Sequence, residues 1–531
     1  MLLLSFIQEL VFRGNVSAKK LHCALRLGLA MTLSFLTALT AHAGAGSESI
    51  VIANARIIGG EASSEILHDV LIEGDRIAGI RKAAARKQGL SSAWPLLNAK
   101  IIDAKGAYLT PGLIDAHVHL DGVPGYHGND PKDAEMLRQA REQMPRSYTY
   151  FGFTTLLDLT GETSFIAEWN QNPMAPRAHF CTPVTIPNGY PAIFVGKELQ
   201  FKVPQSQAML WDPAQANVYP SDFVPEQHSP EAVVAFAHQV GSSCVKVFYE
   251  TGFGAQRNLP LPSVDLIRSV VTAAHQRHLP VYLHGNSQAA YDFALQTGVD
   301  VLVHGLWHEN KDVEQNLNQT RLRQMSQELK QASISVQPTI QVLYGEQEET
   351  NPRFFEHTYV ANAIPMRLRQ WYQSHQGQYF QRMLSEQVST GSMTAEQTYQ
   401  AMQAMYAKPL ATVRSMTSNL HQAGVRLQFG SDTPSGPFYT QFPGMNGRWE
   451  MDRWLEAGMS LQELFDAMTR DNAKALGLEK QIGRVAVGMQ ADLLLMRENP
   501  LRSIQAYDQI QTVFLRGKPI QREQLSATKL R

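Results

Sequence analysis

Residues 113–120 read LIDAHVHL and place two histidines, His117 and His119, at the end of an apolar run that follows the turn sequence Thr-Pro-Gly at 110–112. Alternate residues of a strand point to the same side, so the two imidazoles can converge on one point. An HxH at a strand end is either a pair of metal ligands or two polar residues where the strand reaches the surface. The choice depends on whether further ligands follow along the chain.

Length and composition indicate a globular protein with more than one domain. The chain has 531 residues, of which 44% are hydrophobic and 18% charged, and its formal net charge is −1. Single cores rarely grow beyond about 250–300 residues, which predicts one large domain and a smaller one. The balanced charge gives no electrostatic reason to expect nucleic acid or an anionic membrane as a partner.

The three cysteines are Cys23, Cys181 and Cys244. This number excludes a disulfide framework and a thiolate metal cluster, so any metal must use nitrogen and oxygen ligands. Cys181 and Cys244 lie in apolar strands, where a buried structural thiol is the expected state. Cys23 precedes the apolar run of the leader described next, which argues against a lipoprotein anchor.

The first 43 residues are typical of a secretory signal. Lys19, Lys20 and Arg26 precede the apolar run 27–39, and Ala-His-Ala follows at 41–43. A basic region, an apolar run of this length and an A-x-A site predict cleavage after residue 43 and a periplasmic or secreted protein. The run is shorter than the roughly 20 residues that span a membrane, which argues against a stable anchor.

Short strand-like segments occupy both ends of the remaining chain. They alternate or run apolar over strand lengths and are separated by Gly, Asp and Asn turns. We expect residues 44–110 and 477–531 to form one small composite β-sandwich. The strand-like segments are 49–58, 68–80, 100–109, 491–497 and 512–520.

Residues 111–476 repeat a strand–helix rhythm, with amphipathic helical segments such as 265–278 between the strands. This rhythm predicts a parallel (β/α)8 barrel of the TIM type. A doubly wound sheet is the alternative, but no GxGxxG follows an early strand. The insertion 345–410 is too long for a simple loop, and we predict a helical lid over the barrel mouth. The eight strand segments are 113–120, 153–159, 177–186, 242–250, 280–285, 299–305, 334–340 and 425–432.

In a parallel barrel the functional groups sit at the C-terminal ends of the strands. Each of the later side chains has a structural interpretation: His284 and His304 as core histidines, and Asp432 as a turn or cap residue. Six such side chains at the same end indicate a single site. They are His117, His119, Lys246, His284, His304 and Asp432.

Lys246 is the hardest of the six to explain structurally, because it alternates with Val245 and Val247 in an apolar strand. Burying an unpaired ammonium is costly, so this lysine must be paired, neutral or chemically altered. A lysine that has reacted with carbon dioxide is a carbamate, whose two oxygens can bridge two cations. The set then describes a two-metal site with ions roughly 3.5–4 Å apart. Its ligands suit Zn²⁺ best, with Mn²⁺ and Co²⁺ as alternatives.

In this interpretation the first-strand histidines and Asp432 hold one ion, the two later histidines hold the other, and carboxylated Lys246 lies between them. Water bridging two metals is acidified from pKa 15.7 toward about 7, which gives a hydroxide that attacks a substrate carbonyl. Asp432 takes the proton of that water and passes it to the leaving amine. No GxSxG nucleophile motif is present.

The ordered motifs resemble the amidohydrolase superfamily, and within it the imidazolonepropionase-like and Xaa-Pro dipeptidase-like group. The resemblance runs from about residue 50 to the C-terminus and is weakest over 185–240 and 345–410. The motifs are PGLIDAHVHL, GFTTLLDLTG, CVKVF, VYLHGN, VDVLVHG, FGSDTP and the tail NAKALGLEKQIGRVAVGMQADLLL.

The resemblance implies a (β/α)8 barrel with a composite β-sandwich and metal-ligand roles for all six residues, with Asp432 also the proton shuttle. Members cleave amide or other C–N bonds, including dipeptides, N-acyl amino acids and cyclic amides, and some are deaminases. The strand-four lysine favours the two-metal hydrolases over the one-metal deaminases.

We therefore expect an exported metal-dependent amidohydrolase that cleaves a dipeptide or N-acyl amino acid. The alternatives are a cyclic-amide hydrolase or deaminase, and an ester, lactone or phosphotriester hydrolase using the same hydroxide. A binding protein that had lost catalysis would lack ligands, and none of the six is missing. A homo-oligomer is compatible with these observations.

Four residues that follow strands are candidate contacts for a small-molecule or short-peptide substrate. An ordinary loop role is the alternative for each of them. No local arginine cluster indicates recognition of a substrate carboxylate. The candidates are Tyr249, Arg257, His127 and His308.

Overall fold

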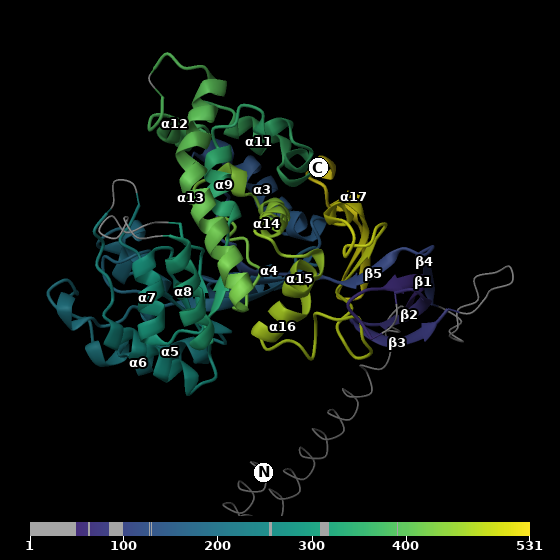
Figure 1. Ribbon diagram of the computed structural model, residues 1–531, viewed down its shortest axis with the longest axis horizontal. Helices are drawn as coiled ribbons and strands as arrows, with labels where there is room; N and C mark the ends of the chain where they lie inside the picture. The colour runs from purple at the N-terminus through teal and green to yellow at the C-terminus, as the bar shows by residue number, and fades with distance from the viewer. Residues whose placement is uncertain are drawn as a thin grey trace, which may run out of the picture.

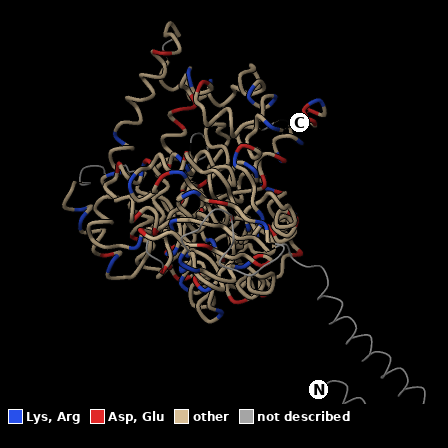
Figure 2. Tube along the Cα trace, turned by 90° about the vertical axis from the view of Figure 1, so that its right-hand side faces the viewer, with Lys and Arg blue, Asp and Glu red and all other residues tan. Residues whose placement is uncertain are grey.

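The computed structural model describes residues 49–61, 64–83, 99–126, 128, 130–253, 257–307, 318–389 and 391–530. The predicted leader with Cys23, and the candidate substrate residues His127 and His308, lie outside these ranges. Lysines and arginines are interspersed with aspartates and glutamates along the trace (Figure 2), as the balanced composition suggests.

One eight-stranded sheet takes strands from both parts of the chain and lies to one side of the molecule (Figure 1). Its order is β15-β14-β13-β5-β1-β2-β3, with β4 paired to β1. The parts meet where β5 (Tyr108–Pro111) pairs antiparallel with β13 (Leu493–Met496). The other strands are β1 (Ile50–Ile57), β2 (Leu67–Glu73), β3 (Arg76–Lys82), β4 (Lys100–Asp103), β14 (Ile510–Leu515) and β15 (Lys518–Gln521).

Seven parallel strands form the second sheet, which curls in the order β12-β11-β10-β9-β8-β7-β6. Only one residue, Gly112, separates β5 from β6, so the two sheets are joined at the first histidine strand. The seven strands are β6 (Leu113–Val118), β7 (Phe153–Asp158), β8 (Arg177–Pro183), β9 (Cys244–Phe248), β10 (Val281–His284), β11 (Val301–Val303) and β12 (Ser335–Gln337). Each falls within a segment predicted from the sequence.

The eighth segment, predicted over 425–432, is not a regular strand. It nevertheless bonds to both edges of the curled sheet: Gln428 N donates to Val336 O (2.9 Å) in β12, and Ala116 N donates to Phe429 O (3.1 Å) from β6. Its geometry is dictated by close approach, because a Cβ at Gly430 would lie 2.6 Å from the Cβ of His117. Asp432 has a φ of 54°, so its backbone lies in the left-handed region and not in the extended one.

Helices cover the outer face of the curled sheet. In α6 the buried Ile267, Val270 and Ala274 recur at helical spacing, and the hydroxyl of Ser263 caps the helix by accepting from Leu266 N. The helices along this face are α3 (Ala134–Tyr150), α4 (Thr163–Gln171), α5 (Pro230–Gln239), α6 (Val264–His275), α7 (Gln288–Thr297) and α8 (Gln319–Gln331). After the last segment come α14 (Met445–Glu456), α15 (Leu461–Asp466), α16 (Asn472–Ala475) and α17 (Arg522–Leu525).

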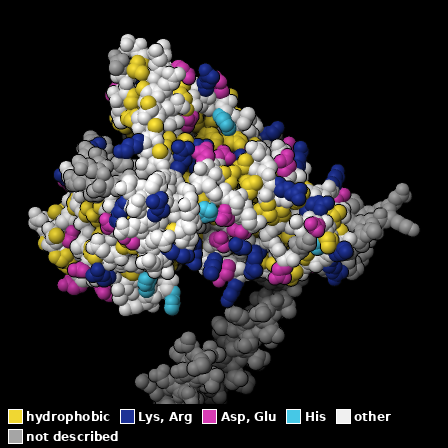
Figure 3. All heavy atoms as spheres, in the orientation of Figure 1, with side chains coloured by type: hydrophobic (Ala, Val, Ile, Leu, Met, Phe, Trp, Pro, Cys, Tyr) yellow, Lys and Arg dark blue, Asp and Glu magenta, His cyan; other side chains and the backbone are white. Residues whose placement is uncertain are grey.

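The stretch predicted as an insertion is helical and projects from the body of the molecule (Figure 1). The first and last of its helices extend beyond the predicted bounds of 345–410. The helices are α9 (Gln341–Glu348), α10 (Thr358–Ala363), α11 (Met366–Tyr372), α12 (Tyr379–Ser385) and α13 (Ala395–Ala423). Hydrophobic side chains reach its surface (Figure 3), where Met366, Tyr379, Met383 and Met405 are exposed. No helix in the described ranges has both the length and the apolarity needed to cross a membrane.

Cys181 and Cys244 form a disulfide, which overturns the expectation of two buried free thiols. They are 63 residues apart in sequence, but the parallel register of β8 and β9 places them opposite each other. Both side chains are buried in an apolar cluster with Ala116 and Leu157. Lys246 follows Cys244 by two positions and therefore points to the same side of β9.

Removing this disulfide is expected to destabilise the fold. In the double variant Cys181→Ala/Cys244→Ala the unfolded chain gains conformational freedom, so we expect the free energy of unfolding to fall by about 2–4 kcal/mol. Urea unfolding followed by circular dichroism measures the change. Thiol labelling in denaturant is the control, and alkylation of both cysteines before reduction would contradict the bond.

Candidate metal centre

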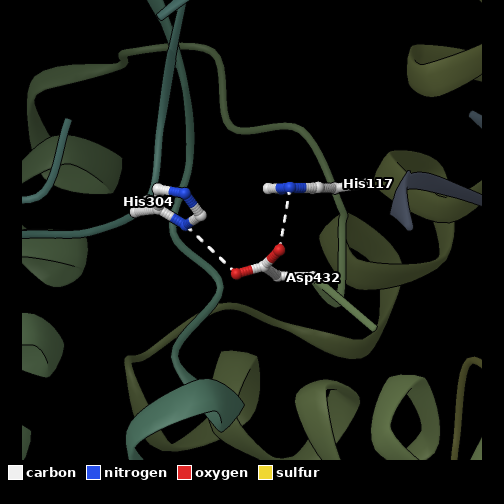
Figure 4. A group of neighbouring side chains, drawn as sticks. All are labelled: His117, His304 and Asp432. Atoms are coloured by element: carbon white, nitrogen blue, oxygen red, sulfur yellow. Dashed lines mark ion pairs between the residues drawn. The ribbon is translucent and has the colours of Figure 1, made fainter. Parts of the chain in front are cut away.

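The six residues predicted from the strand ends come together, and the carboxylate of Asp432 lies at their centre. Its Oδ1 is 2.9 Å from Nε2 of His117 and 3.1 Å from Nε2 of His119. Its Oδ2 is 3.5 Å from Nδ1 of His304. Figure 4 shows His117 and His304 each facing one oxygen of this carboxylate.

The remaining two residues extend the cluster toward β9 and β10. Nδ1 of His284 lies 2.8 Å from Nε2 of His304, and its Nε2 lies 3.5 Å from Oε2 of Glu250. Lys246 is 1% exposed and opposes Tyr282 in the register of β9 and β10. Burial lowers the pKa of Lys246 to about 7, although the charge of Asp432 raises it.

A second buried aspartate positions the end of β6. Asp115 accepts hydrogen bonds from Ser431 N (2.9 Å), Ser431 Oγ (2.5 Å) and His117 N (3.2 Å). It therefore joins β6 to the segment that carries Asp432. Burial raises the pKa of Asp115 to about 7, while its hydrogen bonds with Ser431 lower it. Removing Asp115 would leave these donors unpaired in the core.

Burial and the contacts with Asp432 act in opposite directions on the pKa values of the histidines. Burial lowers the pKa of His119, but its hydrogen bond with Asp432 and the charges of Asp432 and Asp158 outweigh burial, so this pKa is raised. Burial lowers the pKa of His117 to about 3 and also lowers the pKa values of His284 and His304. Burial raises the pKa of Asp432, but its close contacts with His117 and His304 and its hydrogen bond with His119 outweigh that effect, and the pKa lies well below its usual value. Neutral imidazoles beside an ionised carboxylate are the forms that bind a divalent cation.

Unpaired ring nitrogens show that the residues fit a metal. Both ring nitrogens of His117 and Nε2 of His284 are buried without a hydrogen bond, and the contact of His117 with Asp432 is close but not aligned as one. Such atoms are costly to leave unsatisfied. One ligand atom each from His117, His304 and Asp432 lies within 4.8 Å of the others. Nitrogen and carboxylate oxygen donors of this kind suit Zn²⁺.

Of the candidate substrate residues, the two in the described ranges, Tyr249 and Arg257, are not drawn into this cluster. The ring of Tyr249 packs 4.4 Å from that of Phe293 in α7, on the outer side of the sheet. Arg257 is exposed on the loop after β9. Alternation along β9 explains the placement of Tyr249, because it is three residues beyond the inward-facing Lys246.

Two aromatic residues beside the histidines were missed by the sequence reasoning. The ring of Tyr190 stacks on His284 at 4.6 Å, and Trp307 lies 4.6 Å from His304. Tyr190 comes from the loop after β8, where no metal-ligand residue type drew attention to the strand end. Trp307 is three residues beyond His304, and this short separation in sequence could have indicated that it lies beside the histidine.

Comparisons with known proteins agree with this geometry. The profile of the Amidohydrolase family matches residues 231–521, more than half of the chain. A dihydroorotase of Lactococcus lactis subsp. lactis (strain IL1403) is 37% identical over 72 residues, which are 14% of this chain and 15% of that protein. The chain thus matches only a small part of that relative's length.

Two solved structures share the fold over most of the chain. A Xaa-Pro dipeptidase with bound methionine has a TM-score of 0.57 and 18% identity, covering 89% of this chain and 100% of that one. A prolidase in complex with N-methylphosphonate-L-proline has a TM-score of 0.60 and 18% identity, covering 89% and 99%. At this identity the likeness is one of fold.

The substitution Asp432→Asn tests the centre of the cluster. It keeps the side-chain volume but removes the charge that the histidines face, so we expect a folded protein whose affinity for divalent metal falls by more than about 100-fold. Elemental analysis after dialysis against a weak chelator measures this loss. The matched control is Asp292→Asn, an aspartate on α7 that pairs with Arg321 (3.1 Å) instead of the histidines. Unchanged metal content in Asp432→Asn would contradict the assignment.

Proposed function

Because this chain belongs to the amidohydrolase family, we propose that it is a metal-dependent hydrolase that cleaves the C–N bond of dipeptides or N-acyl amino acids. The observation that carries the proposal is the convergence of His117 and His304 on Asp432 in a buried site at one end of the parallel sheet. Nitrogen and oxygen donors at the strand ends of such a sheet are the arrangement of a catalytic metal site.

We propose further that the curled sheet is a (β/α)8 barrel. Support comes from the hydrogen bonds of segment 426–433 to both edge strands, β12 and β6. The side chain of Asn472 adds to these bonds, since its Nδ2 donates to Ile114 O (3.1 Å) and Phe429 O (2.8 Å) across the same seam.

The proposed ligand arrangement is binuclear. One ion would be held by His117, His119 and Asp432, the other by the two later histidines, with carboxylated Lys246 shared between them. The lowered pKa of Lys246, about 7, leaves a large fraction of neutral amine at neutral pH. That form can bond to carbon dioxide with release of a proton, which gives the carbamate.

When bound, two divalent ions of the zinc type would acidify a water molecule and polarise the substrate carbonyl. The remaining work falls to this chain's own side chains. An oxygen of Asp432 accepts the proton of the attacking water and returns it to the leaving nitrogen. The burial of Asp432 and of the histidines keeps bulk water from competing for that proton.

Dipeptides are favoured as substrates by the shared fold with a Xaa-Pro dipeptidase and a prolidase. We also propose that the protein is exported. The signal-like residues 1–43 support this, and so does the disulfide between Cys181 and Cys244, because such bonds are rare in reducing compartments.

Lys246→Ala tests the binuclear arrangement. Without the bridging group we expect metal content to fall from close to two ions per chain to one or fewer, and dipeptide hydrolysis to fall by more than about 100-fold. Elemental analysis and release of free amino acids from a Xaa-Pro dipeptide series measure the two effects, with Lys330→Ala on α8 as the control.

Matched amide and ester substrates separate the proposed activity from its alternative. Faster turnover of the dipeptide than of its ester counterpart supports an amidohydrolase. A zinc-loaded wild type, prepared with bicarbonate, that cleaves no dipeptide or N-acyl amino acid would contradict the proposed function. If Lys246→Ala kept two ions and full activity, the proposed carbamate would be contradicted and the proposed hydrolase function would stand.

A further inference from the structure

Glu346 is a partly buried carboxylate on α9 that the ligand set does not use. Its Oε2 accepts a hydrogen bond of 2.6 Å from the hydroxyl of Tyr406 on α13. Among the described residues no lysine, arginine or histidine forms an ion pair with it. A carboxylate that is partly withdrawn from water without a cation beside it loses hydration that no opposite charge replaces.

The helix that carries Glu346 borders the metal centre. α9 starts just after β12, where Thr339 Oγ1 lies 3.0 Å from Nδ1 of His304. Further along, Gly345 O accepts a hydrogen bond from Thr440 Oγ1 (2.7 Å), so α9 also contacts the loop that follows Asp432. α9 therefore bridges two of the strand ends that supply ligands.

The contact between Gly345 and Thr440 sets the adjacent Glu346 beside the loop that follows Asp432. Burial raises the pKa of Glu346 to about 7, the hydrogen bond from Tyr406 lowers it, and the charge of Asp432 raises it. A cation arriving beside Glu346 would relieve both the burial penalty and this repulsion.

Glu348, two residues further on, has a similar bond but a different setting. Its Oε1 accepts from the hydroxyl of Tyr399 on the same helix, α13, and its Oε2 accepts from Asn351 Nδ2 (2.6 Å). It lines a separate cavity of about 190 Å³ together with Arg353 and Arg453. Glu348 thus joins α9 to α13 beside two arginines. It is the matched comparison for Glu346, because it has the same kind of bond to a tyrosine of α13 but lies in a different cavity.

We propose that Glu346, held in place by Tyr406, binds the protonated amine of the substrate, so that the substrate class is dipeptides with a free N-terminus and not N-acyl amino acids. The inference rests on the proposed function, because it assumes that the scissile carbonyl sits at the metal centre. In a dipeptide the α-amino nitrogen is two bonds from that carbonyl carbon, which suits an anionic group at the edge of the same site. Charged hydrogen bonds of this kind are the stronger ones in proteins.

The test compares Ala-Pro with N-acetyl-Ala-Pro on the metal-loaded full chain. In Glu346→Gln we expect kcat/KM for Ala-Pro to fall about 10- to 100-fold, the loss that removing one charged hydrogen bond produces. For the acetylated substrate we expect little change. Tyr406→Phe should show a smaller loss with the same selectivity, and Glu348→Gln, the matched control, should leave the ratio of the two substrates unchanged.

A binding measurement keeps this inference separate from the proposed function. The probe is the Ala-Pro analogue in which carbon replaces the scissile nitrogen, together with its N-acetyl derivative, titrated by calorimetry into wild type and Glu346→Gln. If wild type cleaves neither substrate, the proposed function fails, but tighter binding of the amine-bearing probe to wild type than to Glu346→Gln still supports the amine site. Three results would overturn the amine site. They are equal binding of the amine-bearing probe to wild type and Glu346→Gln, an equal loss of kcat/KM on both substrates in Glu346→Gln, and the same change in substrate ratio in Glu348→Gln.

Discussion

The carboxylate of Asp432 is the point on which the centre depends. It contacts histidines from β6 and from the end of β11, although 313 residues separate it from His119. A buried carboxylate is stable only when its oxygens have partners, and here the partners are the rings of His117, His119 and His304. The histidines and the aspartate therefore need one another, because each offers polar atoms to the others within one site.

This requirement explains the irregular backbone around the site. Asp432 (φ 54°) and His304 (φ 83°) both leave the extended conformation at the point where their side chains turn toward the centre. Strain of this kind persists where surrounding contacts fix it, and Asp115 provides such contacts through Ser431 and the backbone of His117. The irregular strand ends thus bring the side chains of Asp432 and His304 together.

Much of the architecture could be predicted from the sequence. Ligand residue types at successive strand ends must meet when the strands are parallel, and for that reason His117, Lys246 and His284 were identified together. The family predicted from the ordered motifs is confirmed by the family profile. The outward direction of Tyr249 also follows from strand alternation and could have been anticipated.

Other features depend on relations that the sequence does not display. The bond between Cys181 and Cys244 requires the register of two strands that are far apart in the chain, and single-residue spacing gives no sign of it. The loss of strand geometry near residue 430 goes with the close approach of His117 to Gly430. Tyr190 and Glu346 lie on a loop and on a helix in the two regions where the family resemblance is weakest, so no strand-end rule pointed to them.

The pairing of β5 with β13 has a consequence for how the protein is made. β5 leads through Gly112 directly into the first histidine strand, yet its antiparallel partner lies more than 380 residues later in the chain. During synthesis that edge of β5 stays open until the partner strand leaves the ribosome. The sheet that leads into the first histidine strand is therefore completed last, and a chaperone would meet this protein with a hydrogen-bonding edge still exposed.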